Sequence, residues 1–221
     1  MSENQNDNFA FKFIGSVLTT LADEPYMADE PNNNTSFEMA LAVQTMALTN
    51  VMVSLKSNLN SDDHAVCCSL TRTLLEIISN INYMLNYKDK EKISKKYLET
   101  EKSVPEMLYK IRKGEKIRPI YWADISLMKR IKLLNDSYPD INIEAFYYYL
   151  SSYAHADAGF VGSYAYRQRD KIKPILTVFS VLMMMKLIDL LIKAEVINNK
   201  TYHKMIQDFN TRIKKEDSTN E

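Results

Sequence analysis

Apolar residues recur at the spacing of an α-helix through four long stretches of this chain, at about 37–57, 62–87, 143–156 and 172–196. The period of 3.6 residues holds in each stretch, and none of them alternates apolar and polar residues as a half-buried strand does. Only 4 glycines and 6 prolines occur among the 221 residues. The pattern therefore predicts an all-α fold, a helical bundle with almost no sheet.

The two ends of the chain differ in composition from its middle. Residues 1–8 lack the basic region and the apolar run of a secretory signal, so we expect a disordered tail there. Residues 9–213 contain no internal linker and no repeat, which predicts one helical domain, and residues 214–221 form a charged tail. A chain of this length can bury a sizeable core as a single domain.

Short polar side chains mark where three helices should begin. Ser36 follows a loop rich in asparagine and is the expected N-cap of the first core helix. Asp124 is the expected cap of a helix that ends near Leu134, and either Asp140 or Asn142 caps the helix after it. These positions place turns between the predicted helices.

The stretch from 88 to 116 is dense in charge and predicts a peripheral helix that breaks before Pro105. Four cations near its end allow two interpretations, an RNA-binding patch or a solvated helix face. They are Lys110, Arg112, Lys113 and Lys116. Charge runs are usually solvated, which favours the second interpretation.

The charge balance limits the partners. Lys plus Arg and Asp plus Glu each number 28, so the formal net charge is zero and no global field attracts nucleic acid or anionic lipid. Cys67 and Cys68 are adjacent and cannot join distant segments to each other, which fits a reducing cytoplasm. With 3 histidines and no phosphate loop or metal motif, we expect neither a metal nor a cofactor.

The stretch from 172 to 196 is nearly apolar all round, so a membrane span has to be considered. Its uninterrupted apolar run falls short of the roughly 20 residues that a span needs. Lys186, Asp189 and Lys193 also form a polar stripe on the same helix. A central buried helix is the favoured interpretation, and no membrane contact is expected.

Two groups of polar residues stand on otherwise apolar helices. Tyr147, Ser151 and His155 recur every four residues and share one helix face. Arg72 and Glu76 are also four residues apart, on a helix rich in leucine and isoleucine. Charges beside an apolar face are costly when unpaired, so we expect Arg72 and Glu76 to contact the helix of Ser151 and His155.

These residues have the chemistry of a metal-independent ribonuclease if the two helices face each other. His155 would take or give a proton, Arg72 would hold an anionic group, and Glu76 would fix either partner, with Ser151 beside them. A structural interpretation competes with this one. In it, Arg72 and Glu76 form a buried ion pair and His155 donates to a backbone carbonyl, which locks the helices together.

Aromatic and basic residues around this helix are candidates for binding the substrate. Tyr147 and Tyr153 lie on the helix itself. Arg167 and Arg169 belong to a basic cluster that follows it and that would hold an anion near His155.

The motifs Arg72-x-x-x-Glu76 and Tyr147-x-x-Leu150-Ser151-x-x-x-His155, followed by a long apolar helix, resemble an uncharacterised bacterial family of helical domains of unknown function. That family is distantly similar to the HEPN superfamily of helical bundles. The similarity spans about 36–196. It implies a dimeric protein of a defence or stress system that cleaves or binds RNA.

HEPN ribonucleases use an Arg-x(4–6)-His motif across a dimer interface, and this chain departs from that motif. The positions four to seven before His155 are Tyr148 to Ser151, with no arginine among them. The resemblance therefore implies RNA cleavage only if Arg72 supplies the missing cation in space.

Three functions remain open on these grounds. The first is a cytoplasmic HEPN-like bundle that binds or cleaves RNA. The second is a non-catalytic protein whose exposed helices bind a protein partner, and the third is a small-ligand sensor with a tyrosine-lined pocket. The last two helices carry more large apolar side chains than one bundle needs, so a homodimer is expected.

Overall fold

The structure, a computed structural model, describes residues 12–13, 15–17, 35–60, 64–114, 121–154, 169–197, 200 and 203. These residues form helices, turns and short connections, and no strand occurs among them. The predicted all-α helical bundle is therefore confirmed. The two predicted tails, 1–8 and 214–221, lie outside the described residues.

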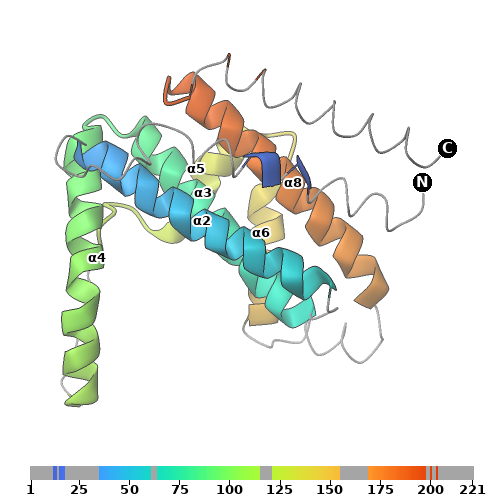
Figure 1. Cartoon of the computed structure of the whole chain (residues 1–221), viewed down its shortest axis with the longest axis horizontal. Coiled ribbons are helices and arrows are strands. Elements are labelled where there is room, and N and C mark those ends of the chain that lie inside the picture. The colour runs from blue at the N-terminus through green and yellow to red at the C-terminus, as the bar shows by residue number, and fades with distance from the viewer. Residues whose placement is uncertain are drawn as a thin grey trace.

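Helix α3 is the centre of the bundle, and α2, α5, α6 and α8 all pack against it (Figure 1). Its apolar face is sealed from solvent at Leu74, Leu75, Ile78 and Ile81. Within the described part of the chain, the labelled helices are α2 (Ser36–Asn60), α3 (His64–Asn86), α4 (Lys90–Arg112), α5 (Leu127–Ser137), α6 (Ile143–Ala154) and α8 (Arg169–Lys193).

Helices α2, α3, α6 and α8 correspond to the four helices that the apolar period predicts. Their bounds differ from the predicted ones by a few residues, as is usual where helix ends fray. Buried side chains from all four helices form one core, to which Phe13 and Val17 also contribute. A smaller apolar cluster joins α3 to the start of α4 through Tyr83, Ile93 and Tyr97.

The start of α2 shows that the predicted N-cap was wrong by one residue. Thr35, rather than Ser36, accepts the backbone N–H of Glu38 on its hydroxyl at 3.2 Å. The Glu38 carboxylate accepts the backbone N–H of Thr35 in return, at 2.8 Å, which completes a capping box. The N–H of Ser36 is instead bonded to the carboxylate of Glu91 in α4, at 3.0 Å.

The other predicted caps have mixed outcomes. Ser126 caps α5, because its side chain accepts the N–H of Lys129, so the predicted cap at Asp124 was wrong. The side chain of Asn142 accepts the N–H of Ala145 at 3.1 Å, so Asn142 is the one of the two candidates that caps α6.

Helix α4 continues through Pro105, so the predicted break was also wrong. A proline inside a helix removes one backbone N–H. Here this happens in the half of α4 that projects away from the bundle (Figure 1), where water can bond the carbonyl that loses its partner. Leu108 and Ile111 in this half are 56% and 57% exposed. This projecting half of α4 is therefore an apolar surface without a partner among the described residues.

Two helices are long and apolar enough to cross a membrane when length and composition alone are considered. They span Ser36–Leu59 in α2 and Lys173–Lys193 in α8, and 39% and 56% of the tested windows are buried inside the structure. The core helix of a soluble protein meets the same criterion. Helix α8 packs on α3, so burial in the bundle accounts for part of its apolar composition.

Candidate functional site

Arg72, Glu76 and Tyr147 form one hydrogen-bonded cluster between α3 and α6. The Nε of Arg72 donates to Oε1 of Glu76 at 3.0 Å and to the phenol oxygen of Tyr147 at 3.3 Å. The Tyr147 hydroxyl donates to the same Oε1 at 2.9 Å. The cluster exists because Arg72 and Glu76 are one turn apart on α3, while α6 packs Tyr147 against that turn.

The cluster is partly shielded from water. The side chains of Arg72 and Glu76 are 23% and 29% exposed, and Tyr147 is buried. Burial alone would lower the pKa of Arg72, but the bond to Tyr147 and the charge of Glu76 outweigh it, so the pKa is raised. Burial, and next the Glu76 charge, raise the pKa of Tyr147. At neutral pH Arg72 is therefore a cation and Tyr147 a neutral phenol.

Arg72 is anchored by one nitrogen only. Both of its hydrogen bonds use Nε, and its two terminal nitrogens have no hydrogen-bond partner among the described residues. Its guanidinium carbon also lies 5.3 Å from the centroid of the Tyr147 ring. The guanidinium is thus held in place while its outer edge is available to a ligand.

Ser151 lies one turn after Tyr147 on α6, as the spacing predicts. Its hydroxyl donates to the backbone carbonyl of Tyr147 at 2.8 Å. The proton of this hydroxyl is therefore committed to the helix backbone in this conformation. The lone pairs of the oxygen stay available as acceptors.

For the remaining predicted site residues, the structure describes a position on a helix or nothing at all. His155 and Arg167 lie outside the described residues, and so does Lys116. Tyr153 lies in the last turn of α6 and Arg169 is the first residue of α8. The structure thus brings together Arg72, Glu76 and Tyr147, with Ser151 one turn after Tyr147 on α6, and for the rest the site remains a prediction.

Arg130 of α5 belongs beside this cluster, and the sequence analysis missed it. It is only 9% exposed. Its Nε donates to Oδ1 of Asn80 at 3.0 Å and its Nη1 to the carbonyl of Ile125 at 2.8 Å. Its guanidinium carbon lies 5.1 Å from the Trp122 ring centroid. Burial lowers the pKa of Arg130, while Tyr83 and then Glu76 act in the opposite direction.

A sequence signal for Arg130 did exist. Leu127, Ile131 and Leu134 are apolar positions of α5, and residue 130 falls between them at the helical spacing of a buried stripe. The neighbouring cations Lys129 and Lys132 are exposed, so the arginine looks like one more member of a solvated charge run. The period, rather than the residue type, identifies it as buried.

The α3 residues that form these hydrogen bonds lie on successive turns of the helix. Arg72 and Glu76 meet Tyr147, and Asn80 meets Arg130. Glu76 is the carboxylate that acts on both guanidiniums. This row therefore contains two cations and one carboxylate, an excess of positive charge in a partly buried place.

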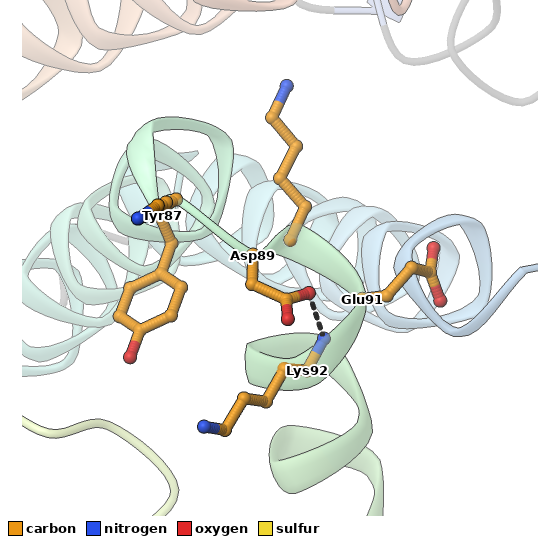
Figure 2. Close-up of a pocket in the computed structure, with 6 residues that line it drawn as sticks. Tyr87, Asp89, Glu91 and Lys92 are labelled. Atoms are coloured by element: carbon orange, nitrogen blue, oxygen red, sulfur yellow. Dashed lines mark hydrogen bonds between the residues drawn. The ribbon is translucent and has the colours of Figure 1, made fainter.

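A concave surface of about 630 Å³ lies elsewhere, at the turn between α3 and α4. Figure 2 shows Tyr87, Asp89, Glu91 and Lys92 around it. Asp89 accepts the backbone N–H of Lys92 at 3.0 Å, and Glu91 points away from Asp89 to reach the start of α2. Both carboxylates are thus bound to helix N-termini, and this surface is a structural junction rather than a catalytic centre.

A smaller cavity of about 290 Å³ lies near the ends of α3, α5 and α8. Lys90 and Lys193 line it together with Tyr138. Lys193 pairs with Asp189 at 2.9 Å and Lys90 lies 5.5 Å from the Phe37 ring centroid, which accounts for the two lysines without a ligand. Among the described residues, no group of three His, Cys, Asp or Glu side chains could hold a metal ion.

Comparisons with known proteins add no assignment. No family model matches the chain, and no curated protein or solved structure matches it either.

Proposed function

We propose that this chain is a HEPN-like helical protein of a bacterial defence or stress system that binds RNA and cleaves it without a metal. Arg72, Glu76, Ser151 and His155 would form the catalytic group. The observation that carries the proposal is the anchoring of Arg72, whose Nε is bonded to Glu76 and Tyr147. A guanidinium held in this way presents its outer edge to a phosphate.

Each residue has a role in the proposed reaction. Arg72 binds the non-bridging oxygens of the phosphodiester and stabilises the charge that develops on them. Glu76 and Tyr147 keep the guanidinium in position. His155, four residues after Ser151, takes the proton from the ribose 2′-hydroxyl. The 2′-oxygen then bonds to phosphorus, the bond to the 5′-oxygen breaks, and that oxygen leaves with a proton from water.

The proposal includes a cytoplasmic homodimer. Three apolar side chains on one side of α8 are far from buried: Ile175 is 49% exposed, Val178 59% and Met185 45%. Their spacing of three and then seven residues places them on one helix face. A second copy of the chain would cover this face, and light scattering at tens of micromolar protein tests the dimer.

The deciding experiment compares two histidines. Wild type, His155→Ala and His203→Ala are incubated with a single-stranded oligoribonucleotide in the presence of a chelator, and their unfolding is measured in urea. We expect His155→Ala to abolish cleavage with little loss of stability, while the exposed His203 tolerates the same change. If His155→Ala melts well below wild type and the wild type neither cleaves nor binds RNA, the catalytic proposal fails.

A second candidate function is a non-catalytic protein that binds a protein partner. It is favoured by the projecting half of α4, where Val104, Leu108 and Ile111 are 38%, 56% and 57% exposed. They share one helix face with the buried Ile93 and Tyr97. Under this proposal, Leu108→Ser would abolish binding of the protein partner without lowering stability, and His155→Ala would leave that binding intact.

A further inference from the structure

We infer that Arg130 is a phosphate-binding residue, and that Arg130 and Arg72 together bind the phosphoryl oxygens of one ligand. The ligand is an RNA chain if the proposed function holds, and the inference rests on that function for this identity. Pyrophosphate and nucleotides carry the same chemistry, so the experiment below separates these sources. Four observations support the inference.

The first observation is that Arg130 is buried without a hydrogen-bonded carboxylate among the described residues. It is 9% exposed, and both hydrogen-bond acceptors that it contacts are neutral, the amide oxygen of Asn80 and the carbonyl of Ile125. A buried cation is costly unless an anion pairs with it. Neutral acceptors offset that cost only in part, and a bound anion would offset more of it.

Nearby acidic groups do not fill that role. Asp124 accepts hydrogen bonds from Tyr87 and Lys96, which commits its two carboxylate oxygens. Glu76 influences Arg130 electrostatically but is bonded to Arg72 and Tyr147. The other titratable groups that act on Arg130 are the neutral phenols of Tyr83 and Tyr147.

The second observation is that one terminal nitrogen of the guanidinium keeps its N–H groups free for a further acceptor. Nε and Nη1 are bonded, and Nη2 has no hydrogen-bond partner among the described residues. Among all the described residues, Oγ1 of Thr177 is the one side-chain nitrogen or oxygen that is fully buried and has no hydrogen-bond partner. Nη2 of Arg130 is therefore not a fully buried atom.

The third observation is that the guanidinium is held in a fixed orientation. Asn80 and Ile125 bind two of its nitrogens, and the Trp122 ring lies 5.1 Å from its carbon. A planar guanidinium on an aromatic ring presents its remaining N–H groups in a defined direction. Lysine in the same place would keep the charge but lose the second donor and the stacking.

The fourth observation is the relation between the two arginines. Arg72 is bonded to Glu76 and Arg130 to Asn80, and these partners are one turn apart on α3, a rise of about 6 Å. Two guanidiniums that are bonded to adjacent turns of one helix can each meet a different phosphoryl group of one ligand. The chemical class of the ligand is therefore a polyphosphate or a phosphodiester chain.

The experiment uses the full chain with two probes, sodium pyrophosphate and a short single-stranded oligoribonucleotide. Binding is measured by titration calorimetry and by the shift in melting temperature, for wild type, Arg130→Lys and Arg130→Met. Lys132→Met is the matched control, because it removes an exposed cation from the same helix. We expect both Arg130 variants to bind about tenfold more weakly or worse, and the control to bind like wild type.

Each outcome decides the matter. If Arg130→Met does not fold, Arg130→Lys decides, because it keeps the charge and the aliphatic stem. Pyrophosphate binding that Arg130→Lys weakens supports the inference even if RNA does not bind, and the proposed function then fails alone. If RNA binding is lost in Arg72→Lys but unchanged in Arg130→Lys, the inference is overturned and the function stands. If wild type binds neither probe, both are wrong.

Discussion

Tyr147 donates its phenolic hydrogen to Oε1 of Glu76 over 2.9 Å, and this bond joins α6 to α3. The Nε of Arg72 donates to the same oxygen at 3.0 Å. One carboxylate oxygen therefore receives donors from both helices. The catalytic and the structural interpretation both depend on this arrangement, because it orients the guanidinium and also ties the helices together.

Tyr147→Phe tests the energy of this bond. The change removes the hydroxyl but keeps the ring, so Glu76 loses one of its two donors in a partly exposed place. We expect the free energy of unfolding in urea to fall by about 1–2 kcal/mol. Tyr148→Phe is the control, since Tyr148 is 58% exposed. Equal stability of the two variants would contradict the expected role of Tyr147.

Tyr87, Tyr138 and Tyr147, like Tyr83, have raised pKa values, which makes the stability depend on alkaline pH. Burial is the main cause that raises the pKa of Tyr138 and of Tyr147. A hydrogen bond to Asp124 raises the pKa of Tyr87 to about 12. An unfolded tyrosine has a pKa of about 10. Because the folded values are higher, the folded state prefers the neutral phenol, and that stability is complete below about pH 10 and lost as the pH rises through the folded values.

Urea unfolding at several pH values between neutral and strongly alkaline checks this dependence. We expect the free energy of unfolding to decline from about pH 10 upward. The decline should be shallower in Tyr147→Phe, which removes one of the contributing phenols. An unfolding free energy that is constant up to about pH 12 would refute the expectation for these tyrosines.

The core of the fold was predictable because burial imposes a period. Helices α2, α3, α6 and α8 each bury a face, and the recurrence of apolar residues every three or four positions shows it. The continuation of α4 through Pro105 was not predictable, because proline disfavours the helical conformation of the residue before it and leaves one carbonyl without its donor. In the projecting half of α4 water can satisfy that carbonyl, so the helix continues.

Caps and polar partners were predicted less well, since several residues of the same type compete locally. Thr35 and Ser36 are both good caps, and the glutamate at position 38 identifies Thr35 through the capping box. Asp124 has the chemistry of a cap but binds Tyr87 and Lys96 instead. Those partners come from distant segments, which no local pattern reveals.

The candidate site also has a part that was predictable from the sequence and a part that was not. The contact of Arg72 and Glu76 with α6 follows from the cost of leaving charges beside an apolar face, and the bonds to Tyr147 agree with it. Arg130 was missed because residue type was given more weight than position on the helix. His155 lies outside the described residues, so its role remains a prediction.

Cys67 and Cys68 should be unreactive in the folded protein. Both are fully buried, and burial, together with the neighbouring Cys67, raises the pKa of the Cys68 thiol to about 12. Only the thiolate reacts with alkylating reagents. Mass spectrometry after iodoacetamide at neutral pH should therefore show no modification of native protein and two modifications after unfolding in urea. Labelling of the native protein at the same rate as the unfolded chain would contradict the buried location.

Thr177 offers a test in which a substitution should stabilise the protein. It is 5% exposed, and its Oγ1 is the only fully buried side-chain oxygen or nitrogen without a hydrogen-bond partner among the described residues. Burying an unpaired hydroxyl is unfavourable. Valine has the same branched shape without that hydroxyl, so Thr177→Val should raise the free energy of unfolding by about 1 kcal/mol.

Thr71→Val is the matched control for Thr177→Val, since Thr71 is also buried on a core helix. Its hydroxyl donates to the carbonyl of Cys67 at 2.8 Å, so the same substitution removes a bond that is made. We expect Thr71→Val to lower the free energy of unfolding by about 0.5–1.5 kcal/mol. Opposite signs for the two variants in urea unfolding would confirm that the pairing of the hydroxyl, rather than its burial, sets the effect. A loss of stability in both would mean that Thr177 has a partner after all.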